Sequence, residues 1–100
     1  MDAKGFQLDC SLPDTVKVSG RLSFATAAAV LEALGGAFAR GRATQLDLAA
    51  VESCDSAGLA CVLAVLAEAS AASRPVRVLN VPAGMHDLAQ VSGVASLIAV

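Results

Sequence analysis

A short strand that runs into a helix is the feature that most constrains how this 100-residue chain can fold. The strand is a short apolar run that we expect to end near Ala49 or Ala50. The apolar residues of this run are Leu46, Leu48 and Val51. The helix is predicted because apolar residues then recur three and four positions apart, with alanine in the gaps. These positions are Leu59, Val62, Leu63 and Leu66. The pentapeptide between them, Asp55-Ser56-Ala57-Gly58-Leu59, is therefore predicted to be a strand-to-helix turn.

The turn contains residues that suit the start of a helix. The first amide groups of a helix lack partners within it, and an Asp or Ser side chain can accept hydrogen bonds from them. We predict that Asp55 is the N-cap and that Ser56 is the first helical residue, with its hydroxyl turned outward. Gly58 has no side chain, so another backbone or a partner protein can approach closely there. Asp and Ser also cap helices that have no binding function. Local chemistry alone therefore does not decide whether these residues only cap the helix or also form a binding site.

The same stretch resembles the STAS family, the domain of bacterial anti-sigma factor antagonists and of sulphate transporter tails. In that family a strand of the pattern D-L-S leads through a loop to D-S/T-x-G-L at the start of a helix. The matching residues here are Leu46-Asp47-Leu48-Ala49, Val51 and Asp55-Ser56-Ala57-Gly58-Leu59-Ala60, with Ala49 where serine is usual. Gly20-Arg21-Leu22-Ser23 also fits the G-x-L/I-x segment of STAS domains. The resemblance covers roughly residues 15–98 and implies the STAS architecture.

The N-terminal third is predicted to form a hairpin and a helix. Phe6, Leu8 and Cys10 alternate with polar residues, as do Val16 and Val18, and Pro13-Asp14 supplies the turn between two antiparallel strands. We expect the second strand to end at Gly20 and Ser23 to cap a helix that stops at Gly41. The apolar face of this helix comprises Phe24, Ala27, Leu31, Leu34 and Phe38.

Two pairs of residues near the end of this helix have distinct expected roles. Gly35 and Gly36 either bend or fray the helix, or allow it to pack closely on a sheet. Arg40 and Arg42 are expected to stabilise the C-terminal end of its dipole.

The C-terminal third continues the α/β pattern. Ala72-Ser73-Arg74-Pro75 breaks the central helix, and the β-branched run from Val76 to Val81 predicts a strand parallel to the earlier one, closed by Pro82. A last helix is predicted from about Ala83 to Val91, with Gly93 as its stop. The tail from Ala95 to Val100 is expected to be a short edge strand or a packed extension.

These elements predict an α/β fold: one STAS-like domain over residues 1–100, with a mixed four- to five-stranded sheet and helices mainly on one face. Leu48, Leu63 and Val78 are expected to be buried between the sheet and the central helix.

Charge and composition argue against several classes of protein. A net charge of -2 with 16% charged residues disfavours binding to nucleic acid or anionic lipid. The sequence has no apolar run of the roughly 18 to 20 residues that span a bilayer. Met1-Asp2-Ala3-Lys4-Gly5 does not resemble the start of a signal peptide, so we expect a cytoplasmic protein. Cys10, Cys54 and Cys61 form no C-x-x-C pair and are expected to be small buried hydrophobic residues, without a disulfide or a zinc site.

No catalytic constellation is recognisable in the sequence. His86 stands beside Asp87 without further metal ligands, and Ser56 has no G-x-S-x-G context. No Gly-rich phosphate loop follows a strand. We therefore expect a non-enzymatic binding module without cofactor or metal; a pocket for a lipophilic ligand has no polar constellation to support it.

The resemblance leaves two hypotheses for the partner. In the first, which we favour, the chain is the STAS subunit of an Mla-type phospholipid-transport ABC system, binds its cytoplasmic ATPase, and lies at the inner membrane only through that complex. The segment Leu88-Ala89-Gln90-Val91-Ser92-Gly93-Val94 is similar to an L-A-x-L/V-aromatic-G-V pattern of those subunits, with Ser92 replacing the aromatic residue.

In the second hypothesis, the chain is an anti-sigma factor antagonist whose Ser56 is phosphorylated by an anti-sigma factor kinase. A phosphate there would meet the free amides of a helix N-terminus, and its charge beside Glu52 and Asp55 would repel an acidic partner. Under either hypothesis the partner is expected to bind over the turn and the exposed side of the following helix. The predicted partner-binding residues are Ser53, Asp55, Ser56, Ala57, Gly58 and Ala60.

Overall fold

Four strands form a single sheet in their sequence order in this computed structural model, which describes residues 5–98. In chain order the elements are β1 (Phe6–Asp9), β2 (Thr15–Leu22), α1 (Ala27–Arg40), β3 (Gln45–Cys54), α2 (Ser56–Ala71), β4 (Arg77–Leu79), α3 (Ala83–Val91) and α4 (Ala95–Ile98). β1 pairs with β2 antiparallel, whereas β2 with β3 and β3 with β4 are parallel. The predicted hairpin and the predicted parallel pair are both confirmed.

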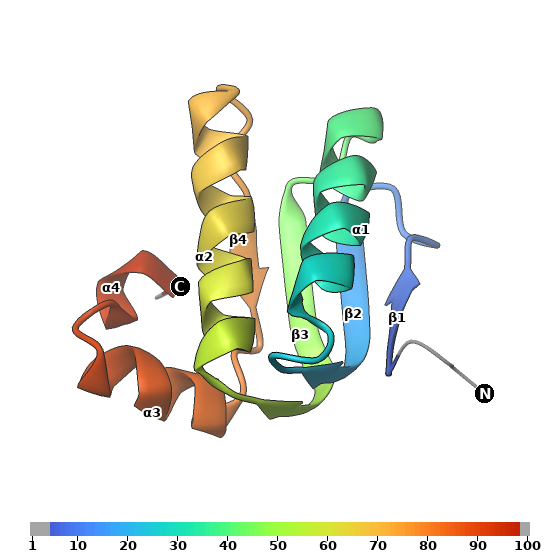
Figure 1. Ribbon diagram of the computed structural model, residues 1–100. Helices are drawn as coiled ribbons and strands as arrows, with labels where there is room; N and C mark the ends of the chain where they lie inside the picture. Colours follow the sequence, from blue (N-terminus) through green and yellow to red (C-terminus); the bar gives the residue numbers. More distant parts are fainter. Residues whose placement is uncertain (1–4, 99–100) are drawn as a thin grey trace.

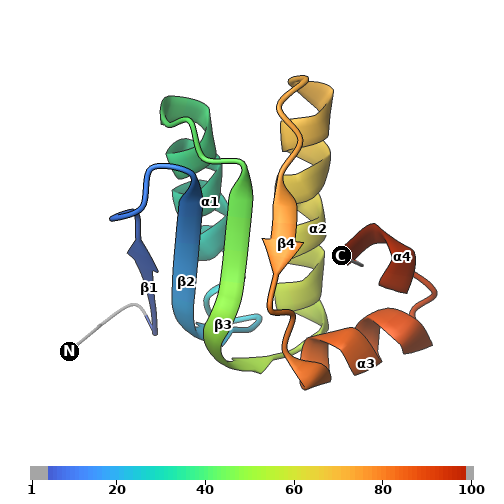
Figure 2. The ribbon, with the colours of Figure 1, turned by 180° about the vertical axis from the view of Figure 1, so that it is seen from behind.

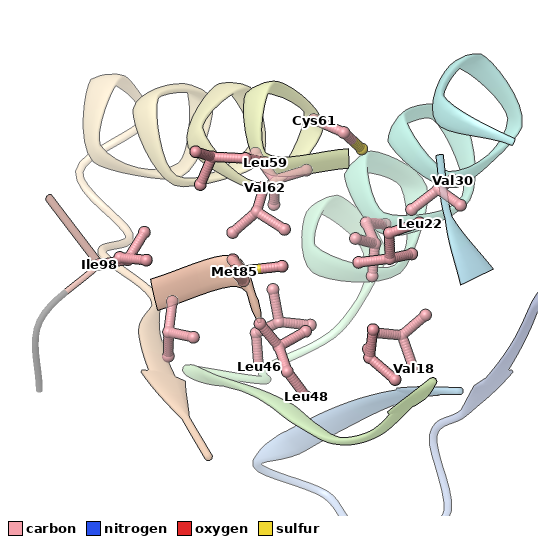
Figure 3. Packing of buried hydrophobic residues seen from close by; sticks show 14 of the residues in the cluster. Val18, Leu22, Val30, Leu46, Leu48, Leu59, Cys61, Val62, Met85 and Ile98 are labelled. Carbon is pink, nitrogen blue, oxygen red and sulfur yellow. The ribbon is translucent and has the colours of Figure 1, made fainter. Parts of the chain in front are cut away.

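The helices gather on one face of this sheet. α1 and α2 lie side by side in front of the strands in Figure 1, and the strands are in front when the molecule is seen from behind in Figure 2. Between the two layers lies one apolar core, to which α3 contributes Met85 and α4 contributes Ile98 (Figure 3). The prediction of a mixed α/β fold with helices mainly on one face is confirmed.

The boundaries of β2 and β3 differ from the prediction. β2 does not end at Gly20 but continues to Leu22, and β3 does not end near Ala49 or Ala50 but continues to Cys54. Gly20 has φ +97 and lies where the register between β2 and β3 shifts; a Cβ there would overlap the backbone of Gly5. The glycine therefore allows an irregularity inside the strand instead of ending it.

The start of α1 was also predicted wrongly. Its N-cap is Thr26, without a side-chain cap bond, and the residues from Ser23 to Thr26 form a separate turn. The Thr26 hydroxyl accepts from the Ser23 N–H at 2.9 Å, while the Thr26 and Ala27 amides both donate to the Ser23 carbonyl. Ser23 thus belongs to the turn, and Phe24, expected on the buried helix face, is instead 86% exposed.

The buried faces of the two long helices are rotated from those expected. On α1, Val30 is buried with Leu34 and Phe38, whereas Leu31 is half-buried. On α2, the buried residues are Gly58, Leu59, Cys61, Val62 and Val65. Leu63 is half-buried, so its predicted place in the core is wrong, while the prediction for Leu48 and Val78 is confirmed. Alanine and cysteine give a weak pattern, so the apolar spacing on α2 did not define one face.

The glycine pair neither breaks α1 nor packs it on the sheet. α1 runs unbroken to Arg40, and a Cβ at Gly35 would meet nothing within 4 Å, because Gly35 borders a pocket of about 180 Å³ between α1 and α2. Arg40 lies in the last turn of α1 as predicted. Arg74, in the loop after α2, also binds the end of α1. Its guanidinium donates to the carbonyl of Ala39 at 3.2 Å and to that of Gly41.

The last part of the chain has its elements in the predicted order, but β4 covers only Arg77–Leu79 and is shorter than the strand predicted from Val76 to Val81. α3 spans Ala83–Val91 as expected, and Gly93 follows it with φ +75. Of the two alternatives predicted for the tail, the packed extension is observed and the edge strand is not: the tail forms the short helix α4, whose Ile98 is buried in the core. The expectations for Met1 to Lys4 and for Ala99 and Val100 fall outside the described residues.

The observed orientation of α2 can be tested with two leucines of that helix. Leu59 is 4% exposed and Leu63 is half-buried. We expect Leu59→Ala to lower the free energy of unfolding by about 2 to 5 kcal/mol, because it leaves a cavity in the core. Leu63→Ala should cost clearly less in the same urea titration. Equal losses would contradict the observed orientation of α2.

Candidate functional site

Both carboxylate oxygens of Asp55 bind backbone amides at the N-terminal end of α2. Oδ1 accepts from the N–H of Gly58 at 3.0 Å, which confirms the predicted N-cap. Oδ2 accepts from the N–H of Phe24 at 3.0 Å, on the turn between β2 and α1. These bonds favour the ionised carboxylate and hold the pKa of Asp55 below its ordinary value, the bond from Phe24 being the larger cause. Asp55 thus joins two loops that are distant in sequence.

Gly58 allows the first turn of α2 to lie against the end of β2. A Cβ at this position would overlap the carbonyl oxygen of Leu22, and the same oxygen accepts from the Asp55 N–H at 3.1 Å. Of the two roles left open for Gly58, the structure shows a close approach of another backbone. Gly58 is itself buried, so it positions the surface residues around it instead of lying on the surface.

The other predicted contact residues lie around this helix start. Ser53, Asp55, Ser56 and Ala60 are exposed, and Ala57 is half-buried. Ser53 is in the last part of β3, whereas Ser56 begins α2 and Ala60 follows one turn later. The structure therefore brings the predicted residues to one end of the molecule, at the lower edge in Figure 1.

The sequence did not indicate the part of this site that comes from the β2–α1 turn. Thr26 is buried, and its hydroxyl is 2.8 Å from the Arg21 carbonyl, to which it donates. Together with the bond from Phe24 to Asp55, this contact holds the turn against the start of α2. Phe24 and Asp55 are 31 positions apart, so no local pattern could have revealed the bond between them.

The thiols near this end are not activated. Cys61 is buried, as expected, and burial raises its pKa to about 11. Burial also raises the pKa of the half-buried Cys54, and the charge of Asp55 adds to this. Cys10 is exposed beyond the end of β1, contrary to the prediction. The thiols of Cys54 and Cys61 therefore remain protonated at neutral pH and are poor nucleophiles.

Residues 5–98 contain no group of three or more His, Cys, Asp or Glu side chains arranged to hold a metal ion. None of the helices in this part of the chain has the length and apolar character needed to cross a membrane.

The fold is similar to that of anti-sigma factor antagonists. One from Mycobacterium paratuberculosis shares 22% identity with a TM-score of 0.74 over 98% of this chain and 86% of that chain. Unphosphorylated SpoIIAA, also an anti-sigma factor antagonist, shares 23% identity with a TM-score of 0.70 over 92% and 84%. The phosphorylated form of SpoIIAA, a Bacillus cell fate determinant, gives 24% and 0.66 over 92% and 86%. At these identities the likeness establishes a shared fold.

The family follows from the sequence itself. The family model described as "Mlab, STAS domain" matches residues 7–99. The chain therefore belongs to the MlaB-type STAS domain family, as its resemblance indicated. No curated protein sequence matches the chain.

The close approach at Gly58 can be tested with two glycines, each in a helix. Gly58→Ala places a methyl group against the Leu22 carbonyl, so we expect a large loss of stability or failure to fold. Gly35→Ala is the matched control: its methyl group has free space, and it should stabilise the protein by about 0.5 to 1 kcal/mol. Thermal unfolding of both variants gives the comparison. A Gly58→Ala protein as stable as the original would contradict the contact.

The role of the Asp55 carboxylate can be tested by its pH dependence. Its pKa is lowered on folding, so its stabilising effect is present above the unfolded-state pKa and is lost as pH falls through the folded-state value. Asp55→Asn leaves one acceptor oxygen for two amides. We expect a lower urea midpoint at about pH 7 and a smaller fall in that midpoint between about pH 5 and pH 2. Identical pH profiles of the two proteins would contradict the role assigned to the carboxylate.

Proposed function

We propose that the chain is a non-catalytic, cytoplasmic STAS subunit that binds the ATPase of an Mla-type phospholipid-transport ABC system and supports its assembly and activity. Membership of the MlaB-type family supports the transporter context. In this proposal residues 1–100 act as one domain that recognises the ATPase. The domain is associated with the inner membrane only through the complex.

The observation that carries the proposal is the exposed start of α2. Ser56 and Ala60 are one helical turn apart, so they lie on the same side of α2, and both are exposed. Their positions are fixed by the Asp55 cap and by the contact of Gly58 with Leu22. Small side chains on a fixed backbone suit close contact with another protein, because little conformational freedom is lost on binding. Ser53 and Ala57 complete the proposed contact.

The test places a large cation on this surface. Ala60→Arg should weaken binding to the purified ATPase about tenfold or more, because the side chain and its charge enter the contact. Ala67→Arg is the matched control, since Ala67 is also exposed on α2 but lies two turns further along. Both variants should keep the circular dichroism spectrum of the original protein. Unchanged binding by Ala60→Arg would place the contact elsewhere.

A second candidate function is that of an anti-sigma factor antagonist regulated by phosphorylation of Ser56, with an anti-sigma factor kinase as its partner. The fold shared with such antagonists, one of them in a phosphorylated form, supports it. Ser56 is exposed at a helix N-terminus, where a phosphate is accommodated by the dipole and the first amides.

The variant Ser56→Ala, used in the same binding measurement, separates the two functions. In a transporter contact it removes a hydrogen bond worth about 0.5 to 1.5 kcal/mol, so binding to the ATPase should weaken. In a phosphorylation switch it leaves the domain permanently in its binding form. Phosphorylated Ser56 in the purified native protein, together with full binding by Ser56→Ala, would contradict the transporter proposal. Ser56→Asp adds charge beside Asp55 and should weaken binding in both cases, so it serves as a control.

A further inference from the structure

A large aromatic side chain projects from the loop that Asp55 holds. Phe24 is 86% exposed, although phenylalanine is a residue that folding normally buries. The structure has three other exposed large hydrophobic side chains among residues 5–98: Leu12, Val91 and Leu97. Phe24 differs from them in that its own amide is bonded to the N-cap of α2. Its exposure therefore occurs at the end of the molecule where the proposed partner contact lies.

The backbone around Phe24 is fixed on both sides. Its N–H donates to Asp55 Oδ2 at 3.0 Å. Immediately before it, the Ser23 N–H donates to the Thr26 hydroxyl at 2.9 Å, and that hydroxyl donates to the Arg21 carbonyl at 2.8 Å. Thr26 itself is buried, so the turn rests on the body of the domain. The aromatic ring is thus presented from a rigid turn rather than from a mobile loop.

We propose that Phe24 is the apolar anchor by which this domain binds its protein partner, inserting into a hydrophobic pocket of the ATPase. The inference rests on the proposed function and adds to it a residue from a different loop. Buried aromatic side chains commonly dominate the energetics of protein contacts. A phenylalanine on a fixed backbone loses only its two side-chain torsions on binding, so most of the gain from burial is retained. Small residues around Ser56 then allow the two surfaces to meet closely.

The charges at this end favour a protein pocket over a lipid surface as the occupant. Asp55 is exposed, and its carboxylate, which binds the Phe24 amide, places negative charge directly beside this turn. The exposed Glu52 and Arg21 line one pocket together and carry opposite charges. The Asp55 carboxylate would repel an anionic bilayer at this turn. A protein pocket with an apolar floor and donor groups at its rim complements both the ring and the charges.

The experiment compares two exposed apolar residues in binding to the purified ATPase. Phe24→Ala should raise the dissociation constant about tenfold or more, as expected for an aromatic anchor. Val91→Ala is the matched control, because Val91 is 89% exposed but lies at the end of α3, and it should leave binding within about twofold. Phe24→Leu should fall between the two. Thermal midpoints should not change, because neither side chain is part of the core.

The outcomes separate this inference from the proposed function. If Phe24→Ala binds as tightly as the original while Ala60→Arg is weakened, the anchor is overturned and the ATPase contact stands. If the original protein does not bind the ATPase, the proposed function falls and the anchor falls with it. Sedimentation of the original protein with phosphatidylglycerol vesicles, abolished by Phe24→Ala, would overturn the protein pocket as the occupant.

Discussion

The two hydrogen bonds accepted by the Asp55 carboxylate are the interaction that organises the end of the domain at which α2 begins. One oxygen closes the first turn of α2 through Gly58, and the other holds the β2–α1 turn through Phe24. Because both bonds are stronger to the ionised form, they lower the pKa of Asp55, and the positive end of the helix dipole favours the same charge. A residue that would otherwise cap one helix therefore fixes the relative position of two loops.

The sheet topology explains why these loops meet. β2 and β3 are parallel, and their pairing continues until Leu22 lies opposite Cys54, so both strands end at the same edge. In α/β folds the loops at the carboxyl ends of parallel strands commonly form binding sites. Here the loops are short, and the absence of a side chain at Gly58 lets α2 begin directly against the Leu22 carbonyl. The result is a compact surface built from two loops, at the end seen lowest in Figure 1.

The sequence predicted those features that depend on neighbouring residues. The Asp55 cap, the stop of α1 at Gly41 and the bounds of α3 follow from capping and turn chemistry within a few positions. The failures concern contacts between distant segments. Gly20 looked like a strand end because its pairing with both β1 and β3 was not visible, and Ser23 looked like a cap because the Thr26 hydroxyl and Asp55 organise that turn from elsewhere. The buried face of α2 was ambiguous because alanine weakens its apolar pattern.

The chemistry of this end agrees with the proposed binding function. Both Asp55 oxygens accept amide hydrogen bonds that lower the pKa of the carboxylate, which makes it a weak base. Burial raises the pKa values of Cys54 and Cys61, so neither thiol supplies a nucleophile at neutral pH. What the two loops present instead is the Ser56 hydroxyl, the small side chain of Ala60 and the ring of Phe24, all on fixed backbone. A rigid surface that combines an aromatic group with small and polar neighbours has the composition of a protein contact, and this supports a binding function for the domain.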